Sequence, residues 1–352
     1  MRPLPLLADD IAVPSEEHRA RAAQRQDALT KPRGSLGRLE DIAIELCALQ
    51  ATDRPCADSV PVIIFAGDHG VTAHGTSPYP SEVTTQMMSN FVAGGAAISV
   101  LSRSLGLSME VVDAGTLADP LDGVIVDKPC RGTSDFTAGA AMSEDQLAHA
   151  LGSGERAVER AGQADLLVLG EMGIGNTTAA SALASSLLAR SPEDLVGPGA
   201  GLDASGLVHK LRVVNDALAL HRPEIDGATT PALETLRRLG GLEIAALTGA
   251  IIASTRRGTP VVVDGFIVSV AALVATRLTP SCRPWLLFGT RSAEPGHAAV
   301  LDALDAEPLL DLGLRLGEAS GAALALPLIR AACELHSSMA TFEEAAISGP
   351  AA

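Results

Sequence analysis

A glycine-rich segment at residues 170–175 has the composition of an anion-binding turn. It follows a hydrophobic run that predicts a buried strand at 165–170. It precedes a predicted helix at 176–183, whose N-cap would be Asn176 or Thr177. Backbone N–H groups and the helix dipole at such a junction favour a bound phosphate.

The turn differs from two familiar nucleotide-binding sequences. No Lys-Ser/Thr pair follows its last glycine, and Thr178 occupies the position of the third glycine of a dinucleotide fingerprint. Glu171 lies inside the turn, where its charge would repel a phosphate unless it has another role, such as hydrogen bonding to ribose hydroxyls. The segment predicts a nucleotide site, and a tight strand–helix turn without a ligand is the alternative.

Two further charged residues could act together with this turn. Lys210 is on a predicted helix behind a second glycine turn at 196–203, where it would meet a phosphate, and a solvated lysine is the alternative. Glu318 begins a predicted helix of small residues after an apolar stretch. Burial there would raise its pKa and suit it to general base catalysis, whereas an exposed acid would only complement the helix dipole.

Polar residues that follow the predicted strands are the other candidates, because ligands of open parallel sheets bind beyond the carboxyl ends of the strands. They are Asp68, His69, Asp113, Asp264 and the loop 291–297. Asp68, His69 and His74 could hold a metal, but no third ligand has a firm spacing, so a loop histidine bonded within the protein is the favoured interpretation. We therefore expect no metal and no other cofactor.

The composition argues against several classes of protein. The 352 residues include 26 Lys and Arg against 42 Asp and Glu, and the net charge of −16 disfavours nucleic acid and anionic membranes as partners. Hydrophobic residues make up 47% and aromatic residues 2%, which predicts an aliphatic core. The longest apolar run is too short to span a bilayer. Scattered cysteines and an N-terminus without a signal-peptide pattern predict a cytoplasmic protein.

Short hydrophobic runs alternate with helical patterns, an order that predicts a parallel sheet buried on both faces. About six strands fit this pattern, which is near the usual sheet size. The predicted strands are 60–66, 109–113, 123–127, 165–170, 260–264 and 285–288, and the longer predicted helices are 15–29, 82–101, 143–161, 230–239, 242–255, 266–276 and 318–335. The chain ends show no strand pattern. We therefore expect a large α/β domain at 56–300 and a small helical domain from 1–55 and 301–352.

Ordered motifs extend over nearly the whole chain. They are KPRGSLGRLE (31–40), FAGDHGVTAHG (65–75), VTTQMMSNFVAGGAAISVL (83–101), RGTSDFTAGAAMS (131–143), GEMGIGNTTAASAL (170–183), GLEIAALTGAIIAS (241–254), PVVVDGFIVSVAAL (260–273), SAEPGH (292–297) and LLDLGLRLGEASGAALALPLIRAA (309–332). In content and order they resemble the nicotinate-nucleotide–dimethylbenzimidazole phosphoribosyltransferase family, which makes α-ribazole phosphate for the lower ligand of cobalamin.

The resemblance implies a homodimer of two-domain chains with a Rossmann-like parallel sheet flanked by helices. It implies that Glu318 is the general base. It also implies that phosphate and ribose are bound by Glu171, Gly173, Ile174, Gly175, Asn176, Thr177, Gly201 and Lys210, and that the base is bound by Ser77, Gln86, Met87 and Leu314.

Three positions depart from the family pattern. Ala200 replaces a threonine of the second glycine turn, which would weaken one phosphate hydrogen bond. Ala319-Ser320 replaces Gly-Thr after the catalytic acid, and Gly289-Thr290 replaces a Gly-His-like pair. The last two changes leave the acid itself in place.

The reaction that the resemblance implies needs no metal. The leaving group of nicotinate mononucleotide is a pyridinium, which departs as a neutral pyridine nitrogen without a Lewis acid. The acceptor 5,6-dimethylbenzimidazole must lose one N–H proton, and a single carboxylate can take it. Two alternatives stay open: a nucleotide-binding protein without turnover, and an NAD-dependent oxidoreductase, for which the early strand–GxGxxG–helix unit is missing.

Overall fold

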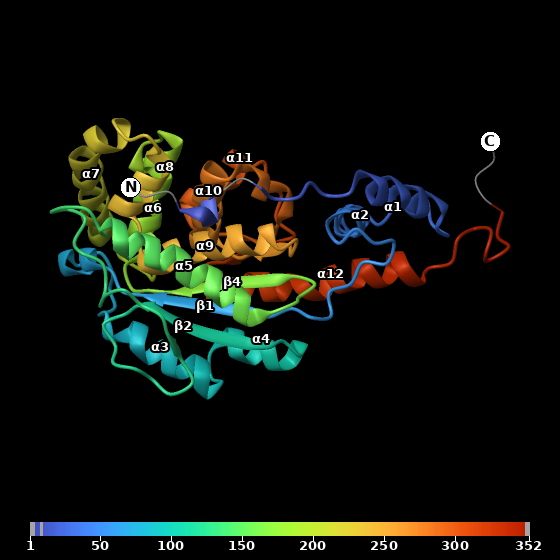
Figure 1. Cartoon of the computed structure of the whole chain (residues 1–352), viewed down its shortest axis with the longest axis horizontal. Coiled ribbons are helices and arrows are strands. Elements are labelled where there is room, and N and C mark those ends of the chain that lie inside the picture. Colours follow the sequence, from blue (N-terminus) through green and yellow to red (C-terminus); the bar gives the residue numbers. More distant parts are fainter. Residues whose placement is uncertain (1–3, 8–9, 349–352) are drawn as a thin grey trace.

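The computed structural model describes residues 4–7 and 10–348 of the chain. A central sheet has helices on both faces, and two N-terminal helices lie beside the far part of a long C-terminal helix (Figure 1). Within the described residues, no helix combines the length and the hydropathy that crossing a membrane requires.

The main sheet has six strands, all parallel. They are β1 (Val62–Gly67), β2 (Met109–Gly115), β3 (Ile125–Val126), β4 (Leu167–Met172), β5 (Val261–Val263) and β6 (Leu286–Phe288). Their order is β3-β2-β1-β4-β5-β6, so the direction in which strands are added reverses between β1 and β4. Ligands of such sheets bind at this switch point. The predicted Rossmann-like sheet is confirmed.

The connecting helices cover both faces of the sheet. They are α1 (Glu16–Ala28), α2 (Arg38–Leu49), α3 (Glu82–Ala93), α4 (Ala97–Leu105), α5 (Glu144–Ala161), α6 (Asn176–Leu188), α7 (Ala204–Asp226), α8 (Pro231–Leu239), α9 (Leu242–Arg256), α10 (Phe266–Leu278), α11 (Pro295–Ala303) and α12 (Ser320–Ser338), with short 3-10 turns η1 (Pro5–Leu7), η2 (Gly70–His74), η3 (Pro192–Asp194) and η4 (Pro280–Trp285). Helices α5, α9 and α10 lie on one side of the sheet, and α3, α4 and α12 lie on the other (Figure 1).

Helix α9 shows why the core can be built from small aliphatic residues. All of its residues from Leu242 to Thr255 are buried, because the helix lies between the sheet and α5. A Cβ added to Gly154 on α5 would lie 2.0 Å from the Ala246 carbonyl oxygen, and one added to Gly249 would lie 2.0 Å from that of Leu151. Glycine at these two positions therefore lets α5 and α9 pack backbone against backbone.

Two predicted helices differ in the structure. The predicted helix at 82–101 is divided into α3 and α4, because Gly94 ends α3 with a left-handed φ of 85°. The Arg103 guanidinium donates to the Gly94 carbonyl at 2.7 Å and closes this corner. Glu318 does not begin the last helix, since α12 starts at Ser320 with Ala319 as its N-cap.

The expectation that residues 301–352 contain no strand is wrong. Strand β8 (Leu310–Leu314) pairs in parallel with β7 (Thr290–Ser292) and forms a separate two-stranded sheet. Its residues are exposed or half-buried, so it lacks the continuous apolar run that marks the central strands. The strand carries the chain toward Glu318.

The two ends of the chain are in contact. Helix α1 packs on α2, and α2 packs on α12. The Arg25 guanidinium on α1 donates to the backbone carbonyls of His336, Ser337 and Met339 at the end of α12. These bonds satisfy carbonyl groups that a helix end leaves without an intrahelical partner.

Candidate functional site

A cavity of about 330 Å³ lies at the carboxyl ends of β4 and β5, next to the first residues of α6 and α12. This is a volume typical of small-molecule sites. The predicted site residues that line it are Ser77, Glu171, Gly173, Ile174, Gly175, Asn176, Thr177, Leu314 and Glu318. The cavity thus brings together most of the residues that the sequence singles out.

Glu318 is a buried wall residue between β8 and α12. The residue is 6% exposed, and its backbone has a left-handed φ of 60°. Burial, followed by the negative charge of Asp264, raises the pKa of its carboxyl to about 7. A group with this pKa can both accept and release a proton at neutral pH, which is the property of an efficient general base.

Ala319 shares the unusual backbone of Glu318, with a φ of 66°. A side chain in the left-handed region costs roughly 1–2 kcal/mol. Its contacts explain why the conformation is kept: a Cβ added to Gly170 on β4 would lie 2.6 Å from the Ala319 nitrogen. The start of α12 therefore packs directly on the backbone of β4.

Replacing Ala319 with Gly is expected to raise the free energy of unfolding by up to about 1 kcal/mol, because glycine adopts a positive φ without strain. The larger entropy of the unfolded glycine chain offsets part of this gain. Urea denaturation measures the difference. Ala322→Gly, inside α12, is the matched control and should lower stability. An equal loss in both variants would show that Ala319 is not strained.

Glu171 lies at the end of β4 and is 5% exposed. Its Oε2 accepts a hydrogen bond from the Asn176 amide, and its Oε1 accepts one from the Glu318 backbone N–H at 3.4 Å. Burial, and then the charge of Asp264, raises the pKa of the Glu171 carboxyl to about 8. At neutral pH the group is mostly protonated, so it can donate as well as accept hydrogen bonds.

The glycine turn packs closely against the end of β1 and against η2. A Cβ added to Gly173 would lie 2.4 Å from the Gly67 carbonyl oxygen, and one added to Gly175 would lie 2.7 Å from Thr72 Cγ2. Gly175, with a φ of 95°, is the N-cap of α6, so the predicted N-cap at Asn176 or Thr177 is wrong. The N-terminus of α6 faces the cavity in the geometry that favours an anion.

Lys210 lies behind the cavity wall. The residue is fully buried on α7, and its ammonium donates to Thr177 Oγ1 at 2.9 Å and to the Gly197 carbonyl at 3.0 Å. Burial lowers the pKa of the amine to about 8, although the charge of Glu294 opposes this shift. Lys210 is therefore a buried cation that is still mostly charged at pH 7, one hydrogen bond away from the cavity.

Three other predicted residues lie outside the cavity wall. Gly201, with a φ of 118°, is exposed in the turn before α7, where its neighbour Ala200 lines the cavity. Gln86 on α3 is exposed, and Met87 is half-buried against the core. These three residues do not line the cavity.

Two buried acids complete the wall, and the sequence marks them only as polar residues after strands. Asp264 Oδ1 accepts a hydrogen bond from the Ala322 backbone N–H at 2.9 Å. Glu294 Oε2 has no hydrogen-bond partner in the described chain, and burial raises the pKa of this carboxyl. An acid directly after the VVV run of β5 is the sequence signal for Asp264, while Glu294 has no comparable signal.

The residues considered for a metal site have separate partners. His69 and Glu243 form a fully buried pair, with Nε2 and Oε1 2.6 Å apart. His74 instead bonds to Asp135 at 2.7 Å, and Asp68 accepts a backbone hydrogen bond. The interpretation of His69 as a histidine bonded within the protein therefore fits the geometry.

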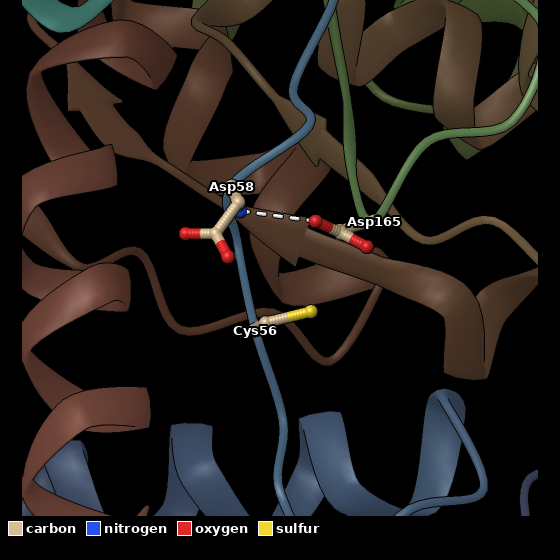
Figure 2. Close-up of side chains that lie close together, drawn as sticks. All are labelled: Cys56, Asp58 and Asp165. Carbon is tan, nitrogen blue, oxygen red and sulfur yellow. Dashed lines mark hydrogen bonds between the residues drawn. The ribbon is translucent and has the colours of Figure 1, made fainter.

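Within residues 4–7 and 10–348, one group of potential metal ligands has its ligand atoms within 4.8 Å of one another: Cys56, Asp58 and Asp165 (Figure 2). It lies before β1 and β4, at the opposite ends of these strands from the cavity. Asp165 Oδ2 accepts the backbone N–H groups of Asp58 and Ser59 at 3.0 and 2.8 Å. Burial and Asp165 raise the pKa of the Cys56 thiol to about 11. Through these hydrogen bonds Asp165 joins the segment before β4 to the segment before β1.

Comparison with known proteins identifies the family to which the chain is similar. A model described as "Phosphoribosyltransferase" matches residues 11–347. The nicotinate-nucleotide–dimethylbenzimidazole phosphoribosyltransferase of Bradyrhizobium sp. strain ORS 278 is 60% identical over 339 residues, which cover 96% of each chain. The protein of the same name from Pseudomonas aeruginosa strain PAO1 is 58% identical over 334 residues, which cover 94% of each chain.

Solved structures give the same result. The enzyme of that name from Thermus thermophilus superposes with a TM-score of 0.89 at 42% identity, over 96% of this chain and 100% of that one. A second structure, described as CobT from the same organism, has a TM-score of 0.90 at 43% identity. It covers 95% of this chain and 100% of that one.

Proposed function

The chain belongs to the nicotinate-nucleotide–dimethylbenzimidazole phosphoribosyltransferase family, and we propose how its residues perform the reaction of that family. The enzyme transfers the 5-phosphoribosyl group of nicotinate mononucleotide to 5,6-dimethylbenzimidazole. The products are α-ribazole 5′-phosphate, for the lower ligand of cobalamin, and nicotinate. The observation that carries the assignment of roles is a buried carboxylate, Glu318, with a pKa near neutrality in the wall of the cavity.

Glu318 is the general base in this proposal. One nitrogen of the benzimidazole attacks C1′ of the ribose, and the N–H proton of its other nitrogen passes to the Glu318 carboxylate. The C1′–N bond to the pyridinium breaks, and its electron pair neutralises the pyridine nitrogen of the departing nicotinate. In-line attack on the β-nucleotide inverts C1′ and gives the α-product.

The nucleotide is held by the segments around β4 and α6. The N-terminus of α6, with the backbone of Gly173–Asn176 and with Thr177, binds the 5′-phosphate, and Lys210 supplies positive charge from behind Thr177. Glu171 exchanges hydrogen bonds with the ribose hydroxyls. Gly201 lies in the turn that closes this end of the site.

The flat acceptor binds next to Glu318, between Ser77 and Leu314. Both residues line the cavity. In this proposal Gln86 and Met87, on α3, contribute to the same base site. An apolar acceptor against Glu318 removes water from the carboxylate and strengthens it as a base.

Release of nicotinate tests the function. Purified protein should release nicotinate from nicotinate mononucleotide only when a benzimidazole is added, and mass spectrometry should identify a ribazole phosphate. A protein that binds the nucleotide and releases no nicotinate with any acceptor of a benzimidazole panel would support the alternative of a nucleotide-binding protein without turnover.

Excess EDTA is expected to leave turnover unchanged, because a pyridinium leaving group departs without a Lewis acid. Initial rates of nicotinate release, with and without chelator, measure this. Loss of activity that Mg²⁺ restores would show that departure of the pyridine nitrogen needs a metal after all.

We also propose a homodimer that works in the cytoplasm, where reducing conditions keep the free cysteines as thiols. Leu312 and Leu316, which are 63% and 57% exposed near the cavity, support an interface on this side. We retain the division into a large domain at 56–300 and a small one from 1–55 and 301–352, which the packing of α1 on α2 and of α2 on α12 supports. A monomeric mass in light scattering would contradict the dimer.

A further inference from the structure

The carboxylate of Asp264 lies where β5 ends and α12 begins. Its Oδ1 accepts the Ala322 backbone N–H at 2.9 Å. Burial raises the pKa of this carboxyl, and the backbone N–H groups of Gly265, Ala319 and Gly321 oppose the shift by favouring its ionised form. The residue is 2% exposed, so these interactions are shielded from water. Asp264 therefore binds the first turn of α12, where the helix dipole favours a negative charge.

The same turn carries Glu318 in a conformation that needs support. Glu318 and Ala319 have consecutive left-handed φ angles of 60° and 66°. Non-glycine residues keep such angles only where the surrounding structure holds them. The Ala319 N–H, which favours the ionised form of Asp264, belongs to the residue directly after Glu318. A Cβ added to Gly321 would lie 2.9 Å from Asp264 Oδ1, so the turn fits closely around the carboxylate.

Asp264 also acts on Glu318 through its charge. After burial, Asp264 is the group that raises the pKa of Glu318, and it is the first charged group that raises the pKa of Glu171. Glu171 faces Glu318 from the end of β4. The charge of Glu243 on α9, which pairs with His69, also raises the pKa of Glu171. Acidic groups thus face Glu318 from both neighbouring strand ends.

We propose that Asp264 is a positioning residue of the transfer reaction, which holds the Glu318 turn at the cavity and makes the Glu318 carboxylate a stronger base. This inference rests on the proposed function, in which Glu318 takes the proton of the acceptor. The two effects of Asp264 are separable. Asparagine keeps the shape and removes the charge, whereas glutamate keeps the charge and is too long to make the same hydrogen bonds.

The test is the pH dependence of kcat/KM for the benzimidazole, at saturating nicotinate mononucleotide. The acid limb of this profile follows the pKa of Glu318, because the carboxylate must be ionised to accept a proton. In Asp264→Asn the limb should move to lower pH by about one unit, and the maximum should fall by roughly 10-fold because the base is weaker. In Asp264→Glu the maximum of kcat/KM should fall, and the acid limb should stay at the pH of the unmodified enzyme. Protonation of the acceptor itself is the same in all variants.

Asp113 provides a matched control. It lies at the end of β2, is 1% exposed, and accepts the backbone N–H groups of Gly115 and Thr116 at 3.2 and 2.7 Å. Asp113→Asn should lower stability and leave the acid limb where it is. An Asp264→Asn protein that is folded by circular dichroism and keeps the original acid limb would overturn the proposal.

Two further results keep the proposal testable. If Asp264→Asn does not fold, Asp264→Glu decides, and an unchanged kcat/KM in that variant refutes the positioning role. Glu318→Gln separates this inference from the proposed function. If Glu318→Gln keeps the normal rate and the acid limb, the general base assignment fails. If Glu318→Gln loses the rate and the acid limb but Asp264→Asn keeps the normal pH profile, only the role of Asp264 is refuted.

Discussion

Glu318→Gln should lower kcat by about 10²–10⁴-fold while both substrates still bind, because general base catalysis contributes about that factor. Glutamine has almost the shape of glutamate but cannot take the N–H proton of the acceptor. Rates of nicotinate release with acceptors of different N–H acidity measure the effect. The variant should also lose the acid limb of the pH profile. In the unmodified enzyme this limb should appear near pH 7, since the pKa of Glu318 is about 7.

Glu40→Gln is the matched control for this substitution. Glu40 is also buried, at 8% exposed, but its carboxylate pairs with Lys31 at 2.8 Å and does not line the cavity. Its replacement should reduce stability and leave kcat unchanged. If Glu318→Gln instead turns over a benzimidazole at the normal rate, with unchanged dependence on acceptor acidity, the base must be another group. Glu171 is then the next candidate.

The central sheet could be predicted because its strands are hydrophobic on both faces. Val261–Val263 and residues 166–169 are continuous apolar runs, a pattern that parallel strands covered on both faces require. The glycine turn after β4 was also recognisable, since glycines at a strand–helix junction mark a close backbone approach. These local patterns identified the element that forms one side of the cavity.

The backbone around Glu318 could not be predicted from local patterns. The small residues after Glu318 have helical propensity, which predicts a helix from 318 onward. In the structure the Ala322 N–H, in the first turn of α12, donates to Asp264, a residue more than fifty positions earlier, and Glu318 and Ala319 lie outside the helix with left-handed φ angles. Likewise, strand β8 depends on pairing with β7 rather than on burial of its own residues. Long-range contacts decide both features.

The burial of Lys210 is another feature that the sequence does not show. A lysine on a helix is usually solvated, and α7 has charged residues on much of its length. In the folded chain, Thr177 Oγ1 and the Gly197 carbonyl bind the ammonium inside the protein. The cost of burying this charge is reduced by hydrogen bonding and by the nearby Glu294. A third N–H of the ammonium is left to interact with a bound anion.

Lys210→Ala should therefore raise the KM for nicotinate mononucleotide by about 10–100-fold and leave the KM for the acceptor nearly unchanged. Hydrogen bonds to charged groups contribute about 1.5–3 kcal/mol, and each 1.4 kcal/mol corresponds to a factor of ten. Steady-state kinetics with each substrate varied in turn give the two constants. An unchanged KM for the mononucleotide would remove Lys210 from the phosphate site.

The pH dependence of donor binding provides a second measurement of the same role. The pKa of Lys210 is lowered to about 8, so its positive charge is present at pH 7 and is lost as the pH rises through 8. A bound phosphate favours the charged amine, and the donor KM should consequently rise above pH 8 in the unmodified enzyme. In Lys210→Ala this rise should disappear. Lys31→Ala is the control, because Lys31 is 8% exposed, pairs with Glu40 and lies outside the cavity wall, and its loss should leave the rise above pH 8 in place.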